Sequence, residues 1–239
     1  MAVYLITGAS SGIGLEMTRL AVARGHKVYA LARRIDLLRE EAARLGELMQ
    51  PVECDVTDRA RVHEVCASLP ELPDVALLNA GLGAFGDKDT FNRDSYERVF
   101  AVNYFGALNF IGEFYEPFVK RGRGVFVGVS SLAGERALPG WPAYCASKAA
   151  LTTTLEGMAI SYRRTGIRYV TVRPSFIDTP MTAGQQQGMF LIWDAKRAAR
   201  YILDGIEAGK IDIAFPLLTR LLVWFARTLP IRIYRAVMR

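Results

Sequence analysis

Tyr144 and Lys148 are the side chains in this sequence whose types and spacing best suit proton transfer. On a helix, residues four apart share one face, which brings the phenol beside the ammonium. A nearby positive charge lowers the pKa of tyrosine from its ordinary value of ~10. The pair is therefore expected to supply a general acid or base near neutral pH. Taken alone, such a tyrosine is more often a half-buried aromatic residue, and such a lysine is more often solvated. The surrounding sequence therefore has to decide between these alternatives and a catalytic pair.

A glycine-rich turn near the N-terminus has the features of a phosphate site. It reads Thr-Gly-Ala-Ser-Ser-Gly-Ile-Gly over residues 7–14, between an expected strand and an expected helix. Glycine lets the backbone approach a pyrophosphate closely, and the helix N-terminus offers free N–H groups and a positive dipole end. A tight turn without a ligand is the alternative, which this position between strand and helix makes weaker.

The end of the second expected strand reads Ala-Leu-Ala-Arg-Arg over residues 30–34. An acid at this place would bind a ribose 2′-hydroxyl, whereas an arginine accommodates a 2′-phosphate with its planar fork of donors. Arg33 and Arg34 therefore indicate NADP(H) in preference to NAD(H). A solvated arginine pair in a loop is the alternative.

Short apolar runs alternate with longer helical patterns along the chain. Near-continuous apolar strands are typical of a parallel sheet that helices cover on both faces. We expect an α/β fold, a Rossmann-type doubly wound three-layer sandwich with a mostly parallel seven-stranded sheet, in which ligands bind beyond the carboxyl ends of the strands. The expected strands are 3–6, 27–32, 51–54, 75–78, 125–129, 167–172 and 211–215. The first expected helix follows the glycine turn and ends near residue 24. The other expected helices span 37–46, 59–69, 95–119, 142–164 and 194–208.

Charge and composition exclude several classes of function. The 239 residues carry a formal net charge of +6, and five arginines without an acid lie within residues 215–239. The rest of the chain is nearly neutral, which argues against a nucleic-acid-binding surface. Three scattered cysteines favour a reducing, cytoplasmic setting, and two histidines without ligand spacing predict no metal site. No uncharged apolar run is long enough to predict a membrane-spanning helix.

Six motifs in this order resemble those of the classical short-chain dehydrogenase/reductase family. They are the glycine turn, Asn79-Ala80-Gly81, Asn103, Ser130-Ser131, the Tyr144/Lys148 pair, and Arg173-Pro174 with Thr179. The resemblance implies that Tyr144 protonates a carbonyl oxygen, Ser131 positions that oxygen, and Lys148 holds the nicotinamide ribose. It also implies that Asn103 supports a water-linked proton path to Lys148. A strand-end or capping role for Ser131, and a buried amide in a distorted helix for Asn103, are the alternatives.

The same resemblance implies cofactor contacts at the carboxyl ends of several strands. Asp55 would bind the adenine amino group, or would cap the helix near Asp58. Ser11 fills a position that is often basic in NADP-binding members, so Arg33 has to carry more of the 2′-phosphate recognition. The implied cofactor residues are Gly8, Ser10, Ser11, Gly12, Ile13, Gly14, Arg33, Arg34, Asp55, Val56, Asn79, Ala80, Gly81, Tyr144, Lys148, Pro174, Ile177 and Thr179.

The loops after the fourth, fifth and sixth expected strands supply the candidate substrate contacts. These candidates are mostly apolar and include no lysine or arginine that could grip a carboxylate or phosphate. We therefore expect an apolar alcohol, aldehyde or ketone, with a substrate loop over about 178–193; simple packing within a lid is the alternative. The candidate substrate contacts are Ser131, Tyr144, Leu132, Trp141, Phe176, Met181 and Phe190.

The C-terminal residues form a separate basic feature. Read as a helix, residues 217–229 place apolar side chains on one wide arc, with Arg220 and Arg227 opposite, and 231–239 repeat the pattern. We expect a single nucleotide-binding domain over 1–215 and an amphipathic helical extension over 216–239. Such an extension can cover the domain's own pocket, pair with a second subunit, or lie on a membrane surface.

The leading hypothesis is an NADP(H)-dependent oxidoreductase that interconverts a carbonyl and an alcohol by hydride transfer. A catalytically silent NADP(H)-binding sensor and a membrane-peripheral scaffold are the alternatives. The complete set of Asn103, Ser131, Tyr144 and Lys148 favours the enzyme. The resemblance also implies a homodimer or homotetramer, formed through the helices expected over 95–119 and 142–164.

Overall fold

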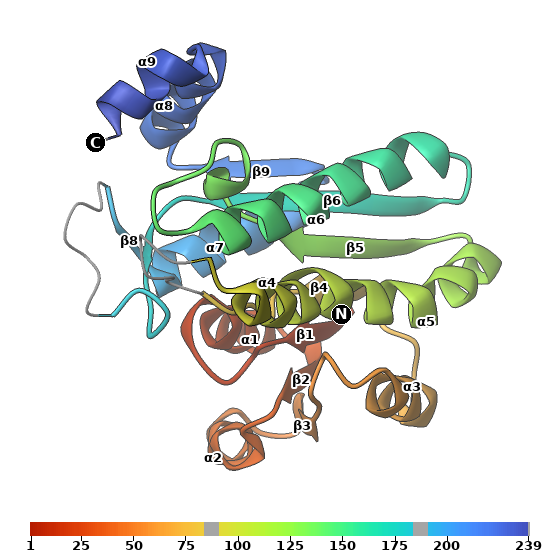
Figure 1. Cartoon of the computed structure of the whole chain (residues 1–239). Helices are drawn as coiled ribbons and strands as arrows, with labels where there is room; N and C mark the ends of the chain where they lie inside the picture. The colour runs from red at the N-terminus through yellow and green to blue at the C-terminus, as the bar shows by residue number, and fades with distance from the viewer. Residues whose placement is uncertain (84–90, 184–190, 239) are drawn as a thin grey trace.

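The expected seven-stranded parallel sheet is confirmed in a computed structural model, which describes residues 1–83, 91–183 and 191–238. The strand order is β3-β2-β1-β4-β5-β6-β9, with every neighbouring pair parallel (Figure 1). The order reverses direction at β1, so the neighbouring ends of β1 and β4 open a crevice for a ligand. The strands are β1 Val3–Thr7, β2 Lys27–Ala32, β3 Met49–Glu53, β4 Val75–Leu78, β5 Gly124–Val129, β6 Ile167–Pro174 and β9 Asp212–Phe215.

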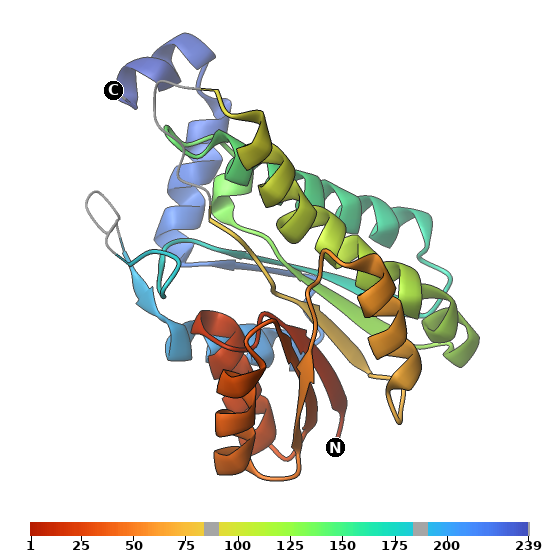
Figure 2. The same cartoon turned by 60° about the horizontal axis from the view of Figure 1, so that its bottom comes forward.

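Helices cover both faces of the sheet and complete the three layers (Figure 2). One buried cluster packs α1, α2 and α7 against the sheet, and a second packs α3, α5 and α6 against the other face. Burial on both faces explains why the strands are apolar almost throughout. These helices are α1 Gly12–Ala23, α2 Ile35–Leu45, α3 Arg59–Ser68, α4 Arg93–Phe100, α5 Gly106–Arg121, α6 Pro142–Ser161 and α7 Ala195–Glu207.

The single helix expected over 95–119 is wrong in one respect, because a π-helical segment interrupts it. This segment, η1, spans Ala101–Phe105 between α4 and α5 and contains Asn103. The buried amide of Asn103 bonds to the backbone of Leu82, and a π-segment often marks a place where a functional group is re-aimed. Hydrophobic periodicity does not register the change, since the apolar side chains continue across it.

A short second sheet and a 3₁₀ turn lie next to the carboxyl edge. The strands β7 Ile177–Asp178 and β8 Trp193–Asp194 pair in parallel, and the turn η2 spans Leu132–Gly134. Neither was expected, because two- and three-residue elements carry no measurable periodicity.

The C-terminal extension is helical, as expected. The helices α8 Leu217–Thr228 and α9 Ile231–Val237 stand beyond β9, the edge strand, at the top of Figure 1. Pro230 separates them and cannot continue the first helix. Among the described residues, none of the helices is both long and apolar enough to cross a bilayer.

Thr7, at the end of β1, joins the first strand to the fourth. Its side chain is buried, and Oγ1 accepts hydrogen bonds from the backbone N–H groups of Asn79 and Ala80, each at 3.0 Å. The Asn79 side chain donates in return to the Thr7 carbonyl oxygen at 3.0 Å. The crevice between β1 and β4 therefore has a fixed width.

Replacing Thr7 with valine should lower the free energy of unfolding by about 1–3 kcal/mol, because the part-buried N–H of Ala80 loses its acceptor and that of Asn79 keeps only the Leu77 carbonyl oxygen. Thr7→Ser keeps the hydroxyl and should cost about 1 kcal/mol, the contribution of one buried methyl group. Urea denaturation of the two variants and the wild type measures both values. Equal losses of unfolding free energy in the valine and serine variants would show that the Thr7 hydroxyl does not contribute to stability.

Candidate active site

The glycine turn is built so that backbone, and not side chains, faces the crevice. Gly8 has φ of +68°, and a Cβ placed there would lie 2.9 Å from the Cα of Ala80. A Cβ on Gly14 would collide with the carbonyl oxygen of Gly8. Ser11 occupies the N-cap of α1 but makes no side-chain capping bond. The first N–H groups of α1 thus form a positive, uncapped end beside the crevice, which suits a phosphate.

Two guanidinium groups lie at the same edge. Arg34 donates from Nη2 to Ser10 Oγ at 3.0 Å and to Ser11 Oγ at 2.9 Å. Arg33 is 74% exposed in its side chain and lies 3.9 Å from an Asp55 carboxylate oxygen, a distance at which an exposed pair is weak. Arg34 therefore places a positive charge beside Ser11, and the larger share of 2′-phosphate recognition expected for Arg33 stays a prediction.

Asp55 does not cap the following helix, so that alternative is wrong. Its Oδ1 accepts from the backbone N–H of Thr57 at 2.9 Å and from the Thr57 hydroxyl at 2.8 Å. Asp58 is the N-cap of α3 and accepts from the N–H of Arg61 at 3.0 Å. Asp55 instead holds a short turn and lines the pocket together with Val56.

Tyr144 and Lys148 both line the pocket from α6. Lys148 is 4% exposed, and its Nζ donates to the carbonyl oxygen of Val129 at 2.8 Å. The same Nζ lies 5.7 Å from the centre of the Tyr144 ring, and Trp141 meets that ring edge-on at 5.6 Å between centroids. The ammonium therefore lies within cation–π distance of the Tyr144 ring.

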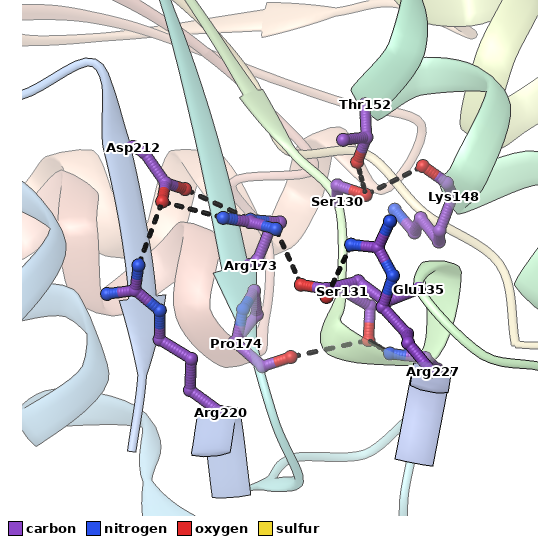
Figure 3. Close-up of polar contacts among 11 residues, drawn as sticks. Ser130, Ser131, Glu135, Lys148, Thr152, Arg173, Pro174, Asp212, Arg220 and Arg227 are labelled. Carbon is purple, nitrogen blue, oxygen red and sulfur yellow. Dashed lines mark hydrogen bonds and ion pairs between the residues drawn. The ribbon is translucent and has the colours of Figure 1, made fainter. Parts of the chain in front are cut away.

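Ser131 faces the same space from the end of β5. Its Oγ donates to the carbonyl oxygen of Pro174 at 3.3 Å and accepts from the N–H of Ala133 at 3.1 Å (Figure 3). The capping role considered for this serine is thus observed, since Ser131 is the N-cap of η2. Capping and pocket lining are compatible, because Ser131 Oγ accepts the capping hydrogen bond while the residue also lines the pocket.

The expected lowering of the tyrosine pKa is wrong for this structure. Burial raises the pKa of Tyr144 to about 12, although its hydrogen bond with Ser131 lowers it in part. Burial also lowers the pKa of Lys148 to about 8, because its charged form loses hydration. The phenol is therefore protonated at neutral pH, and the ammonium is the group that titrates near it.

Asn103 lies behind the pocket wall and is not among the pocket-lining residues. Its Oδ1 accepts from the N–H of Leu82 at 2.7 Å, and its Nδ2 donates to the Leu82 carbonyl oxygen at 3.1 Å and to Ser147 Oγ at 3.0 Å. The alternative of a buried amide in a distorted helix is thus observed. The place of Asn103 in the catalytic set and its role in a proton path stay predictions.

One pocket of about 480 Å³ contains nearly all the predicted site residues. Every implied cofactor residue lines it except Gly14, which lies beneath the turn. Six of the seven candidate substrate contacts also line it: Ser131, Leu132, Trp141, Tyr144, Phe176 and Met181. The seventh, Phe190, lies outside the described residues, as does the rest of 184–190 in the middle of the predicted substrate loop.

Sequence reasoning missed the part of this wall that comes from the C-terminal extension. Thr219, Leu222, Val223 and Ala226 line the pocket from α8, and Tyr234 and Met238 line it beyond. Their spacing of three and four is a signal the sequence does contain. The signal is hard to distinguish because α8 is apolar on most of its circumference. The apolar arc predicted over 217–229 is centred on a different side of the helix from the residues that line the pocket.

Arg136 is a positively charged lining residue that the sequence did not predict. Its Nη2 donates to the Leu229 carbonyl oxygen at 3.1 Å, and its guanidinium lies 4.4 Å from the centre of the Tyr234 ring. Both contacts are with the C-terminal extension, so this charge holds the wall together.

An ion cluster centred on Arg173 and Glu135, whose side chains are 14% and 10% exposed, lies beside Ser131 and Pro174 (Figure 3). Arg173 donates to both carboxylate oxygens of Asp212, at 3.0 and 2.6 Å, and to Glu135 at 2.5 Å. Arg220 and Arg227 of α8 reach the same two acids at 3.7 and 3.2 Å. The cluster therefore joins β6, β9, η2 and α8 beside the Ser131–Pro174 contact.

The cysteines do not add a reactive group to the pocket. All three are free, and burial raises the pKa of the Cys145 thiol, whose Sγ accepts from the Leu138 N–H at 3.4 Å. Cys145 therefore packs as a small neutral side chain. In the described part of the chain, no group of three histidine, cysteine or acidic side chains is arranged to hold a metal ion.

Comparison with known proteins gives the family. A family model described as short chain dehydrogenase matches residues 2–189. An uncharacterized oxidoreductase of Myxococcus xanthus is 33% identical over 98% of this chain and 95% of its own length. The 2-(R)-hydroxypropyl-CoM dehydrogenase of Xanthobacter autotrophicus is 33% identical over 75% of this chain and 76% of its own.

A crystal structure of a short chain dehydrogenase from Burkholderia cenocepacia, in complex with NADP, superposes with a TM-score of 0.86. It is 25% identical in sequence, and the match covers 99% of this chain and 97% of that one. The matched family model and the relatives lead to the same conclusion: the chain belongs to the short-chain dehydrogenase family of oxidoreductases.

Proposed function

We propose that this protein is an NADP(H)-dependent oxidoreductase that interconverts an apolar carbonyl compound and the corresponding alcohol. One observation carries the proposal. Tyr144, Lys148 and Ser131 line the same pocket as the glycine turn and the two arginines. A proton donor and an anion-binding turn in one cavity are what hydride transfer from a phosphorylated dinucleotide requires of a protein.

The residues at the crevice fit such a dinucleotide. A Cβ at Gly8 or Gly14 would fill the space in which the turn approaches Asn79 and Ala80, so the backbone remains accessible. The uncapped N-terminus of α1 would hold the pyrophosphate, and Arg33 and Arg34 would hold a 2′-phosphate. The NADP in the Burkholderia structure supports this preference.

The protein's part in the reaction is the movement of one proton. The bound nicotinamide supplies the hydride to a carbonyl carbon, or accepts it from an alcohol. In reduction, the Tyr144 O–H bond breaks and its proton passes to the substrate oxygen, so that C=O becomes CH–OH. A pKa of about 12 keeps the phenol protonated at neutral pH, which is the form a general acid needs.

Lys148 and Ser131 assist this proton transfer in different ways. The ammonium of Lys148 stabilises the phenolate that forms and, with a pKa of about 8, can return a proton to it. Ser131 Oγ would hold the substrate oxygen next to the phenol. Tyr144 and Lys148 thus divide the two tasks of donating the proton and compensating the charge.

The pocket wall supports an apolar substrate. Trp141, Phe176 and Met181 line it from the body of the protein, and Leu222 and Val223 line it from α8. Among the described residues that line the pocket, Arg136 is the cation not assigned to cofactor or catalysis, and it already contacts Leu229 and Tyr234. This leaves it poorly placed to bind an anionic substrate group.

We also propose that the chain forms a homodimer or homotetramer through α4, α5 and α6, and that it works in the cytoplasm. Exposed apolar side chains support the first point: Phe105 in η1 is 54% exposed, and Ile160 in α6 is 69% exposed. Free thiols at all three cysteines are consistent with a reducing compartment.

Tyr144→Phe should reduce turnover by about 10²–10⁴-fold while NADPH still binds, because only the transferable proton is removed. NADPH oxidation over a panel of apolar aldehydes and ketones measures the turnover, and nucleotide fluorescence measures the binding. Tyr162→Phe, an exposed tyrosine at the C-cap of α6, is the matched control. Undiminished turnover in Tyr144→Phe rejects the mechanism, and a wild type inactive on every substrate favours the silent sensor.

Arg33→Ala and Arg34→Ala should each weaken NADPH binding by about 10–100-fold and leave NADH binding nearly unchanged, since each removes a charge-assisted bond to the 2′-phosphate. Arg39→Ala, an exposed arginine on α2, should affect neither nucleotide. Titration calorimetry with both nucleotides gives the two affinities. Equal losses for NADPH and NADH would remove the cofactor assignment.

The reductive kcat/KM should be level at lower pH and fall by about tenfold per pH unit above pH 8. Below its pKa of about 8 Lys148 carries the charge that stabilises the phenolate, and above it that charge is lost. Lys148→Arg should move the decline to higher pH, because arginine stays protonated. Lys120→Arg, on the surface of α5, is the control. A wild-type profile that stays level well above pH 8 contradicts the assignment.

A further inference from the structure

We propose that the outer face of α8 and α9 docks on an anionic lipid bilayer, while the inner face of the same helices forms the wall of the pocket. The docking itself does not depend on the catalytic proposal. The consequence for substrate delivery, given below, rests on the proposed function.

The extension has a fixed orientation on the body. Arg220 and Arg227 pair with Asp212 and Glu135 (Figure 3), and the hydroxyl of Tyr234 donates to the Ala137 carbonyl oxygen at 2.8 Å. Arg136 binds the backbone of Leu229, between the two helices. The inner stripe of α8 is thereby held against the pocket, and the opposite side of the helix faces outward.

The outward side is apolar and uncovered. No residue of α8 is buried, and its large apolar side chains remain about half exposed or more. Soluble proteins rarely leave an apolar patch of this kind in water without a partner. The exposed side chains are Leu217, Leu218, Leu221, Leu222, Trp224, Phe225, Ile231, Ile233 and Val237, at 50–67% each.

The charge of the extension identifies the partner. Residues 216–239 contain no acid, and Arg220 and Arg227 are already compensated by the body. Arg232 and Arg235 of α9 are exposed and have no acidic partner in the described ranges. A surface that is apolar with uncompensated positive charges is complementary to anionic headgroups above an acyl interior.

A second copy of this chain fits the same face poorly. A two-fold contact places the same patch against itself, so each set of α9 arginines would be buried against a second basic surface. The extension offers no acid to pair with them. With 12 residues, α8 is also too short to span a bilayer, so it would lie along the surface.

Docking in this orientation would bring the pocket to the bilayer. Leu222 is both half exposed and pocket-lining, and Met238 lines the pocket next to the uncompensated arginines. An apolar alcohol or carbonyl compound dissolved in the membrane could enter beside α8 and α9 without crossing water. The substrate class that follows is a membrane-partitioned one.

The test is flotation of the full chain with phosphatidylcholine vesicles, with and without phosphatidylserine, in the absence of cofactor and substrate. The wild type should bind phosphatidylserine vesicles, and added salt should weaken the binding. The double variant Leu221→Glu/Trp224→Glu should bind at least ~10-fold more weakly, since charge replaces the apolar contact. Leu37→Glu, at an exposed apolar position on α2, should bind as the wild type does.

A second pair of variants tests the charge separately and leaves the apolar face intact. Arg232→Gln/Arg235→Gln should weaken phosphatidylserine binding by ~10-fold or more, at about fivefold per arginine. Arg59→Gln/Arg164→Gln makes the same change in net charge elsewhere and should bind normally. Circular dichroism and NADPH binding show whether each variant is folded. If Leu221→Glu/Trp224→Glu does not fold, the arginine double variant alone tests bilayer binding.

Three results would overturn the proposal. They are a wild type that floats with neither vesicle, tail variants that bind as the wild type does, and tail variants that change the mass in light scattering without vesicles. The last would assign the face to self-association. Because vesicle flotation measures no turnover, a failure of the bilayer proposal does not affect the Tyr144→Phe test. A failure of the Tyr144→Phe test likewise does not affect the bilayer proposal.

Discussion

The burial of one ammonium group constrains the whole site. Lys148 is 4% exposed, and a charged amine so far from water needs an acceptor. The acceptor is the carbonyl oxygen of Val129, the last residue of β5, so α6 has to cross the end of that strand closely. Ser130 Oγ fixes this crossing by donating to the Lys148 carbonyl oxygen at 2.7 Å. A Cβ at Gly134 would lie 2.9 Å from the Lys148 carbonyl carbon, so only glycine allows the approach.

The parallel sheet then brings the remaining groups to the same place. Strands that run in one direction end at one edge, so motifs far apart in sequence meet without a dedicated scaffold. Thr7 ties the first strand end to Asn79 after the fourth, and Ser131 ties the fifth to Pro174 on the sixth. The site is therefore as rigid as the edge of the sheet that carries it.

The sequence predicts this architecture well because its signals are local and periodic. The strands, the covering helices and the pocket position of the Tyr144/Lys148 pair follow from apolar runs and from motifs at strand ends. The raised pKa of Tyr144 could not be predicted, because it depends on how much water the assembled walls exclude. The π-segment around Asn103 could not be predicted either, since the apolar periodicity continues across it and the Asn103 amide that it presents bonds to Leu82, 21 residues away.

The C-terminal wall shows the same limit more clearly. Periodicity identified α8 as a helix but could not say which of two apolar sides faces the body. The ion cluster settles the orientation, because Arg220 and Arg227 can reach Asp212 and Glu135 only when Thr219 and Val223 face the pocket. The sequence contains the acids and the arginines, but it does not show which of them pair. The pairing depends on the tertiary contact that places β9 beside β6.

The ion cluster also couples the extension to the chemistry. Arg173 holds both acids that α8 uses, and it immediately precedes Pro174, whose carbonyl oxygen accepts from Ser131. The little-exposed Arg173–Glu135 pair contributes modestly to stability, because desolvation offsets its attraction, and the half-exposed arginines of α8 add little more, but together they favour one arrangement over its neighbours. A movement of α8 would change the charges around Arg173, which directly precedes the residue that Ser131 contacts. The helix that completes the pocket is thus linked, through Arg173 and Pro174, to the hydroxyl of Ser131 at the pocket wall.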